Sequence, residues 1–192
     1  TNNMVKLIIQ IPCFNEAQTL PTTLEEIPLK FNGVDIVEIL VIDDGSVDGT
    51  AEVAKKNGVD HIVRLERNRG LGQAFQTGLR RALELDADII VNTDADNQYC
   101  AKDIQKLIDP ILSGKADFVV GCRPIFSHPE FHFIKKGLQW LGSYILRLMS
   151  KTDVPDAASG FRAYSSETCM KLNVYSDFSH CMESLIHAGN AG

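Results

Sequence analysis

Short apolar runs alternate with helix-forming stretches along residues 1–121, and this rhythm constrains the fold more than any other feature of the chain. The apolar runs predict buried strands, at 5–11, 35–42, 61–65, 88–91 and 117–121. The stretches between them predict helices, at 15–27, 48–57, 73–85 and 103–112. Pro12 is expected to end the first strand, and Asn15 to cap the first helix. Such alternation predicts an α/β fold, with a mainly parallel sheet and helices on both faces.

Residues 122–192 are less regular. A long amphipathic helix is predicted at 133–149, because its apolar residues recur at helical spacing, at Ile134, Leu138, Leu141, Ile145 and Leu148. This stripe packs on a core, or it lies on a membrane surface with Lys135 and Lys136 near anionic lipid. A short strand is predicted after Ser159-Gly160, and short helices near 166–172 and 180–188.

The composition narrows the class of protein. The 192 residues carry a net charge of −6, which argues against a broad nucleic-acid surface. No apolar run approaches the ~20 residues that span a bilayer, and the N-terminus does not resemble a signal peptide. The cysteines are odd in number and include no C-x-x-C pair, which predicts free thiols in a reducing compartment. We therefore expect a single domain in the cytoplasm or at the inner face of the membrane.

Asp94 and Asp96 follow the predicted strand at 88–91 and flank one small residue. In an extended segment, residues i and i+2 point the same way, so the two carboxylates leave the strand side by side. Like charges this close repel unless a cation lies between them, and a divalent metal with oxygen ligands is the usual solution. The alternative is a polar turn whose aspartates cap the next helix.

Polar clusters follow the first, second and fourth predicted strands. In a parallel sheet these strand ends meet at one edge, where ligands of α/β proteins bind. The turn after the first strand has no glycine, which excludes the G-x-G-x-x-G dinucleotide motif, and the chain has no Walker A loop. Any phosphate must therefore be held by a metal, backbone amides and basic side chains.

Five motifs resemble those of the family 2 glycosyltransferases, in the family's order. They are Ile11–Glu16, Val41–Ser46 with Asp48–Thr50, Asn68–Gly70 with Gly72, Ala74 and Gly78, Asp94–Asp96 with Gln98, and Asp156 with Ser159–Arg162. The last resembles the polyprenyl-phosphate branch, which includes dolichol-phosphate mannosyltransferase. The resemblance runs from about residue 5 to residue 189.

The resemblance implies a GT-A fold, a Rossmann-like domain with a nucleotide-sugar-binding half over 1–122 and an acceptor-side half over 123–192. We expect the second half to be shortened at its C-terminus. The implied activity is that of an inverting hexosyltransferase with a UDP- or GDP-linked donor. A polyprenyl-phosphate acceptor is favoured, and a saccharide hydroxyl is the alternative. The rival interpretations are a non-catalytic nucleotide-sugar-binding domain and a sugar nucleotidyltransferase, which would want a glycine-rich basic loop after the first strand.

The resemblance also implies roles for individual residues. The donor nucleotide would be bound by Pro12, Phe14, Asn15, Glu16, Gly72 and either Asp43 or Asp44. Mg²⁺ or Mn²⁺ on the diphosphate would be held by Asp94, Asp96 and Gln98. On the acceptor side, Arg123 and Arg162 would hold a lipid phosphate, in the element that includes Ser159. If the acceptor is a hydroxyl, Asp156 and Glu183 are the candidate bases. Cys13 is expected to be a packing residue of the nucleotide pocket.

Overall fold

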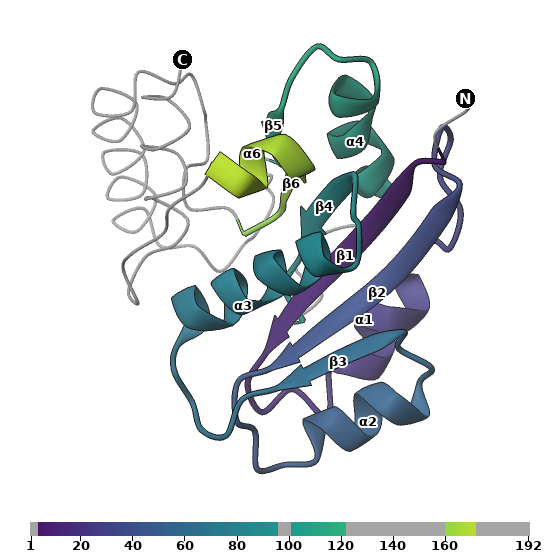
Figure 1. Cartoon of the computed structure of the whole chain (residues 1–192). Coiled ribbons are helices and arrows are strands. Elements are labelled where there is room, and N and C mark those ends of the chain that lie inside the picture. The colour runs from purple at the N-terminus through teal and green to yellow at the C-terminus, as the bar shows by residue number, and fades with distance from the viewer. Residues whose placement is uncertain (1–3, 96–100, 122–159, 172–192) are drawn as a thin grey trace, which may run out of the picture.

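In the part of the chain that the structure describes, six strands form one sheet, in the order β3-β2-β1-β4-β6-β5 (Figure 1). The computed structural model describes residues 4–95, 101–121 and 160–171. The strands are β1 (Lys6–Cys13), β2 (Ile36–Asp43), β3 (His61–Arg64), β4 (Ile89–Asn92), β5 (Phe118–Val120) and β6 (Arg162–Ser165). The helices are α1 (Leu20–Glu26), α2 (Thr50–Lys56), α3 (Leu71–Glu84), η1 (Ala101–Asp103), α4 (Ile104–Leu112) and α6 (Ser166–Lys171).

The sheet is mainly parallel, as the sequence predicted. β1 pairs in parallel with both β2 and β4, and β2 pairs in parallel with β3. β6 is the exception, because it lies antiparallel between β4 and β5. The predicted helices at 133–149 and 180–188 lie outside the described residues.

Helices cover both faces of the sheet, as predicted. Alternate residues of β1 face opposite sides, so that Leu7, Ile9 and Ile11 pack with residues of α1, α2 and α4. On the other face, Ile8 packs with residues of α3 and α6. Figure 1 shows α3 in front of the sheet and α1 behind it. The result is a three-layer α/β/α arrangement with β1 in the middle of the core.

No helix in the part of the chain that the structure describes has both the length and the apolar content to cross a bilayer. Ala74, Phe75 and Leu79 of α3 are buried in the core.

Pro12 does not end the first strand, contrary to expectation, because β1 continues to Cys13 in register with Asp43. The Cys13 carbonyl accepts the Asp44 N–H at 2.8 Å and therefore points toward β2. Since successive residues of a strand point their hydrogen-bonding groups to opposite sides, the Pro12 nitrogen faces the β4 side. Pairing with β4 has already ended there, at Gln10. The missing N–H of Pro12 therefore breaks no ladder bond.

The first helix begins later than predicted, at Leu20, and Asn15 is not its N-cap. Asn15 instead adopts a left-handed conformation with φ of 57°, which asparagine tolerates better than most residues. Its N–H donates to Ser46 Oγ at 2.9 Å, and its side-chain oxygen accepts the Val47 N–H at 3.0 Å. The residue therefore joins two loops instead of starting a helix.

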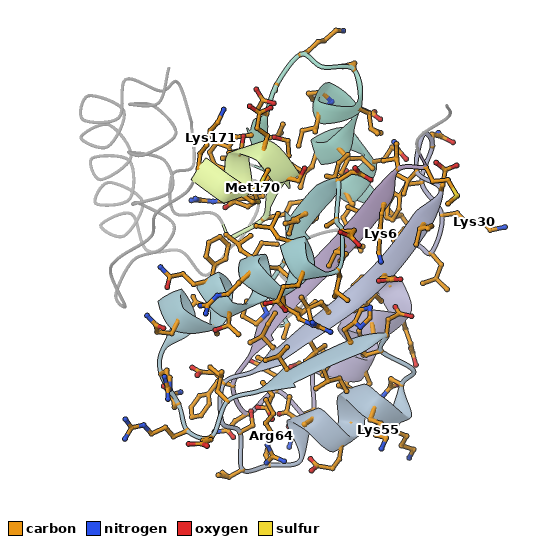
Figure 2. All side chains as sticks on the ribbon, viewed as in Figure 1. Lys6, Lys30, Lys55, Arg64, Met170 and Lys171 are labelled. Carbon is orange, nitrogen blue, oxygen red and sulfur yellow. The ribbon has the colours of Figure 1, made fainter. Side chains whose placement is uncertain are left out.

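A charged cluster lies toward the N-terminal end of the sheet, far from Arg64 at the opposite end (Figure 2). Glu38 Oε2 lies 2.9 Å from Lys6 Nζ and 2.8 Å from His61 Nε2. Burial pushes the pKa of Glu38 upward, but the hydrogen bonds from Lys6 and His61 outweigh it and lower the pKa below its usual value.

We expect Glu38→Gln to lower the free energy of unfolding at neutral pH by at most about 1 kcal/mol, since solvent screens these partly exposed charges. A lowered pKa in the folded state stabilises the fold above the unfolded value of about 4.3, and this contribution is lost as the pH falls through the folded value. The difference from wild type should therefore vanish in acid. Urea unfolding over a pH series measures it.

Glu52→Gln is the matched control, because it removes the same charge from an exposed pair with Arg64. We expect it to leave stability nearly unchanged at every pH. A Glu38→Gln difference that persisted unchanged in acid would show that Glu38 acts through packing and not through its charge.

Candidate functional site

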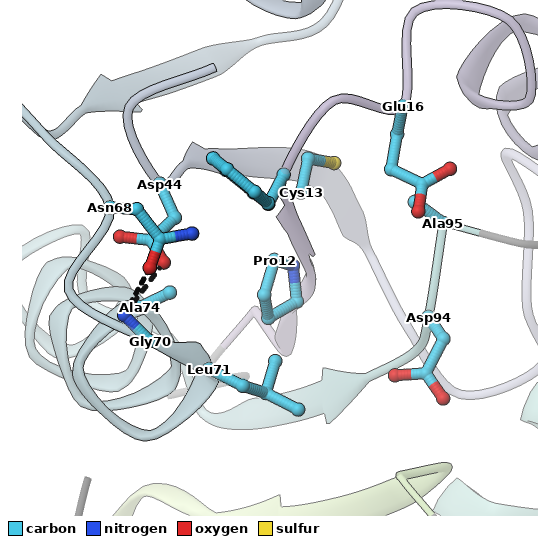
Figure 3. Close-up of a pocket in the computed structure, with 11 residues that line it drawn as sticks. Pro12, Cys13, Glu16, Asp44, Asn68, Gly70, Leu71, Ala74, Asp94 and Ala95 are labelled. Atoms are coloured by element: carbon cyan, nitrogen blue, oxygen red, sulfur yellow. Dashed lines mark hydrogen bonds between the residues drawn. The ribbon is translucent and has the colours of Figure 1, made fainter.

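A cleft of about 420 Å³ opens at the C-terminal ends of β1, β2 and β4 (Figure 3). It is lined by Pro12, Cys13, Phe14, Glu16, Asp44, Asn68, Gly70, Leu71, Ala74, Asp94 and Ala95. The turns after these three strands therefore meet in one place, as the parallel topology predicts.

The loops after β1 and β2 are fastened to each other by hydrogen bonds from backbone to side chain. The Glu16 N–H donates to Thr50 Oγ1 at 3.0 Å, and the Ala17 N–H donates to Asp48 Oδ2 at 3.0 Å. Asp48 also accepts the Thr50 N–H at 3.1 Å, and the hydrogen bond from the Thr50 hydroxyl is the main cause of a lowered Asp48 pKa. Together with the two hydrogen bonds of Asn15, these bonds connect the loop after β1 to the loop after β2.

Asp44 organises the opposite wall. One carboxylate oxygen accepts the N–H of Arg69 at 2.8 Å. The other accepts the N–H of Gly70 at 2.9 Å (Figure 3). Burial raises the pKa of Asp44 even though these hydrogen bonds act in the opposite direction. Gly45 allows the same loop to approach closely, because a Cβ there would lie 2.4 Å from the carbonyl carbon of Arg67. Asp44 therefore holds the loop that carries Asn68 and Gly70 against the cleft.

Asp43 points elsewhere. Its side chain is fully buried, accepts the Ser46 N–H at 2.8 Å and lies 3.4 Å from Arg64 Nε. Of the two adjacent aspartates, therefore, only Asp44 lines the cleft. Asn15 and Gly72, which were also expected at the nucleotide, are not among the lining residues either.

Asp94 lies on the far side of the cleft and is partly exposed. The next residue is clamped, because Thr23 Oγ1 donates to the Ala95 carbonyl at 2.8 Å. Gly160 packs directly on the Asp94 carboxylate, since a Cβ on Gly160 would lie 2.7 and 2.8 Å from its two oxygens. The glycine of the Ser159–Arg162 motif thus meets the first aspartate of the predicted metal motif.

The predicted metal ligands Asp96 and Gln98 lie outside the described residues, as do Arg123, Asp156, Ser159 and Glu183. Within residues 4–95, 101–121 and 160–171, no group of three or more His, Cys, Asp or Glu side chains could hold a metal ion. Asp94 is thus the one described member of the predicted ligand set.

The electrostatics of this edge are mixed. Three carboxylates line the cleft, from Glu16, Asp44 and Asp94. Beside it lies a second cleft of about 380 Å³, lined by Arg67, Asn68, Arg69 and Gln73. A ligand that spans both would meet carboxylates at one end and guanidinium groups at the other. This arrangement suits an anion that is bound together with a cation.

Arg162, expected to bind an acceptor phosphate, is in β6 and only 1% exposed. Its guanidinium carbon lies 5.8 Å from the ring centroid of Phe118, within cation–π range.

Some lining residues were absent from the predicted site, namely Asn68, Gly70, Leu71, Ala74 and Ala95. The third motif of the resemblance contains Asn68, Gly70 and Ala74, so it could have identified these three residues.

Cys13 is a packing residue, as expected, since it is 2% exposed and belongs to the core. Burial strongly raises the pKa of its thiol, and the nearby carboxylates of Glu16, Asp43 and Asp48 raise it further. The thiol is therefore almost entirely protonated near neutral pH, and it is the thiolate that reacts.

We expect Cys13 to react with iodoacetamide in the folded protein more than about tenfold more slowly than in the unfolded chain, because each unit of pKa above the pH removes about nine-tenths of the thiolate. Peptide mass spectrometry after timed alkylation measures this rate. Cys169 is the internal comparison, since burial raises its pKa as well. Labelling of folded Cys13 at the rate of an exposed thiol would contradict the assignment.

Comparisons with a family model and with known proteins all match this chain to glycosyltransferases. A family model described as glycosyl transferase family 2 matches residues 8–172. The chain is 34% identical over 203 residues to the UDP-N-acetylglucosamine–dolichyl-phosphate N-acetylglucosaminyltransferase of Methanococcus voltae, covering 93% of this chain and 78% of that protein. It is 28% identical over 176 residues to the undecaprenyl-phosphate mannosyltransferase of Micrococcus luteus, covering 88% of this chain and 70% of that protein.

A solved structure shares the fold. It is glucosyl-3-phosphoglycerate synthase from Mycobacterium tuberculosis, crystallised with Mn²⁺, uridine diphosphate and glucosyl-3-phosphoglycerate. The TM-score is 0.67 at 24% identity, over 88% of this chain. The chain spans 59% of the length of that solved chain.

Proposed function

Because this chain belongs to glycosyl transferase family 2, we propose that it transfers a sugar from a nucleoside diphosphate to an acceptor. The observation that carries the proposal is the cleft at the C-terminal edge, where the loops after β1, β2 and β4 meet and Asp94 packs on Gly160. Four of the five motifs of the resemblance contribute residues that line this cleft, and the fifth contributes Gly160.

The donor nucleotide would lie between the two walls of the cleft. Phe14 is 46% exposed, and its ring would offer a flat apolar surface to a base. In Figure 3, Asp44 and Asn68 lie on one side of the cleft, Glu16 and Asp94 lie on the other side, and Pro12 lies between them. A UDP- or GDP-linked donor fits this proposal, and relatives of the same fold or family are named for UDP or a UDP-sugar.

The diphosphate would lie near Asp94, with Mg²⁺ or Mn²⁺ held by Asp94, Asp96 and Gln98. Carboxylate and amide oxygens are suitable ligands for such ions, and Asp94 presents its carboxylate at the cleft with Gly160 packed behind it. When bound, the metal would stabilise the diphosphate as it leaves the sugar. Arg67 and Arg69, at the neighbouring cleft, would add positive charge for the same leaving group.

The favoured acceptor is a polyprenyl phosphate, which the names of two relatives support. One phosphate oxygen would bond to the anomeric carbon while the bond from that carbon to the diphosphate breaks, with inversion. This acceptor oxygen is already an anion, so no general base is required. Arg123 would hold the phosphate and position it for attack. Arg162, which follows Ser159 in the same motif, is only 1% exposed, so its proposed role is to support this site and not to contact the phosphate directly. A lipid acceptor would place the reaction at the inner face of a membrane, with the segment 133–149 as the proposed contact.

We expect the chain to bind one of UDP, GDP or dTDP in the presence of Mn²⁺ and to release it on addition of EDTA. Asp94→Asn should weaken this binding by about tenfold or more, because it removes a charged ligand from the metal. Isothermal titration calorimetry measures both effects.

Asp103→Asn is the control for that titration. It makes the same change of charge on η1, where Asp103 pairs with Lys106 at 2.6 Å, and should leave nucleotide affinity unchanged. Nucleotide binding that was unchanged by EDTA would refute the proposed metal site. Failure to bind any of the three nucleotides would refute the proposed donor site.

The acceptor is tested by comparing a polyprenyl phosphate with the matching polyprenol, using the nucleotide-sugar whose nucleotide binds best. We expect a glycosylated product from the phosphate alone, because the polyprenol hydroxyl would need a base to remove its proton. Mass spectrometry of the lipid fraction detects the product. Transfer to the polyprenol or to a saccharide instead would favour a hydroxyl acceptor, with Asp156 or Glu183 as the base.

A further inference from the structure

We propose that Asn92 is a positioning residue, which holds Gly160 and, through it, the Asp94 carboxylate in the geometry that binds the metal. This inference rests on the proposed function, because it assumes that Asp94 is a metal ligand. Its basis is a buried chain of side-chain amides beneath the cleft. Gln10 Nε2 donates to Asn92 Oδ1 at 2.8 Å, and Asn92 Nδ2 donates to the Gly160 carbonyl at 2.7 Å.

The direction of this chain follows from hydrogen-bond chemistry. The Gly160 carbonyl can only accept, so the Asn92 side chain must turn its NH₂ group toward β6. Its oxygen then faces Gln10, which must turn its own NH₂ group toward Asn92. Both side chains are at most 1% exposed, so water does not offer them alternative partners. The amide of Asn92 is thereby fixed in a single orientation.

Two amides at these positions are unusual for the face on which they lie. Gln10 lies two residues after Ile8 on β1, and Asn92 lies two residues after Ile90 on β4, so each amide is on the same face as its isoleucine. Both isoleucines pack in the apolar core beneath α3. Burying a polar group there is costly unless it is hydrogen-bonded. Gln10 Oε1 has no hydrogen-bond partner in the part of the chain that the structure describes. An apolar pair would fill this space at lower cost, so the amides point to a role other than stability.

The chain of side-chain amides ends at Gly160, which contacts the Asp94 carboxylate. Gly160 is buried and lies so close to Asp94 that a Cβ would come within 2.7 Å of a carboxylate oxygen. The Gln10 carbonyl also accepts the Thr93 N–H at 3.1 Å, so the strand that carries the amide chain holds the residue directly before Asp94. A shift of Gly160 would therefore be transmitted to the Asp94 carboxylate without any contact between Asn92 and the metal.

Asn92→Leu in the full chain tests the proposal. It removes the donor to Gly160 while keeping the same number and branching of side-chain heavy atoms. We expect the dissociation constant for Mn²⁺ to rise by about tenfold or more, as is typical when a residue that orients a metal ligand is lost. The probe is Mn²⁺ together with the nucleoside diphosphate that wild type binds best, and the electron paramagnetic resonance signal of free Mn²⁺ reports binding without turnover.

Gln10→Leu is the matched control. It also leaves a buried amide oxygen unpaired, on Asn92, but it keeps the bond from Asn92 to Gly160. Asn92→Leu breaks two buried hydrogen bonds and Gln10→Leu breaks one, so we expect both variants to lose thermal stability, Asn92→Leu more, and only Asn92→Leu to lose Mn²⁺ affinity. Gly160→Ala provides an independent route to the same displacement, because its methyl group would press on the Asp94 oxygens, and it should weaken Mn²⁺ binding too.

Three outcomes would overturn the proposal. Wild-type Mn²⁺ affinity in Asn92→Leu would refute it, and so would an equal loss of affinity in Asn92→Leu and Gln10→Leu that followed their loss of stability. In either case the proposed function would stand, provided that the wild-type chain binds Mn²⁺ with nucleotide. If the wild-type chain shows no such binding, the proposed metal site and this inference both fall.

Discussion

The antiparallel insertion of β6 between β4 and β5 is the constraint on which the candidate site depends. It pairs Arg162 with Asn92 on one side and with Val120 on the other. Because Gly160 lies just before this strand, the pairing brings it onto Asp94, which lies just after β4. A segment from late in the chain thereby completes an edge that otherwise consists of the ends of β1, β2 and β4. The contact is steric, since any residue larger than glycine at position 160 would displace the carboxylate.

Most polar groups around the cleft are already committed to one another. Asp44 uses both carboxylate oxygens on backbone N–H groups, and Asp48 fastens two loops together. These groups shape the cleft and, being bonded, need not reorganise when a ligand enters. The Phe14 ring, which is about half exposed, and the Asp94 carboxylate have access to a ligand. The cleft therefore separates residues that build its walls from those that can contact a substrate.

The alternation of strands and helices, and with it the parallel sheet, could be predicted because each buried strand is a nearly continuous apolar run. Pro12 and Asn15 were misinterpreted because their effects are tertiary. The missing N–H of Pro12 matters only where a neighbouring strand needs it, and the left-handed Asn15 depends on bonds to Ser46 and Val47. Similarly, the sequence could not decide which of the adjacent Asp43 and Asp44 faces the cleft. The position of β6 was beyond local patterns as well, since no spacing rule links residues that are 68 apart in the chain.

Polar groups occur at both ends of the α3-facing side of the sheet. They differ in burial, and therefore in what it costs to break their hydrogen bonds. Glu38, Lys6 and His61 at the N-terminal end are partly exposed, so solvent screens their charges and can replace any bond that breaks. Gln10 and Asn92, nearer the cleft, are sealed from solvent, so water cannot replace a bond that breaks. A hydrogen bond in such a place adds little net stability, but breaking it leaves a buried group unpaired, which costs about 1–3 kcal/mol. Breaking a hydrogen bond of the amide chain therefore costs more than breaking one in the charged cluster, so the geometry of the amide chain is held more tightly. The amide chain is also the one that ends at Gly160, beside the Asp94 carboxylate.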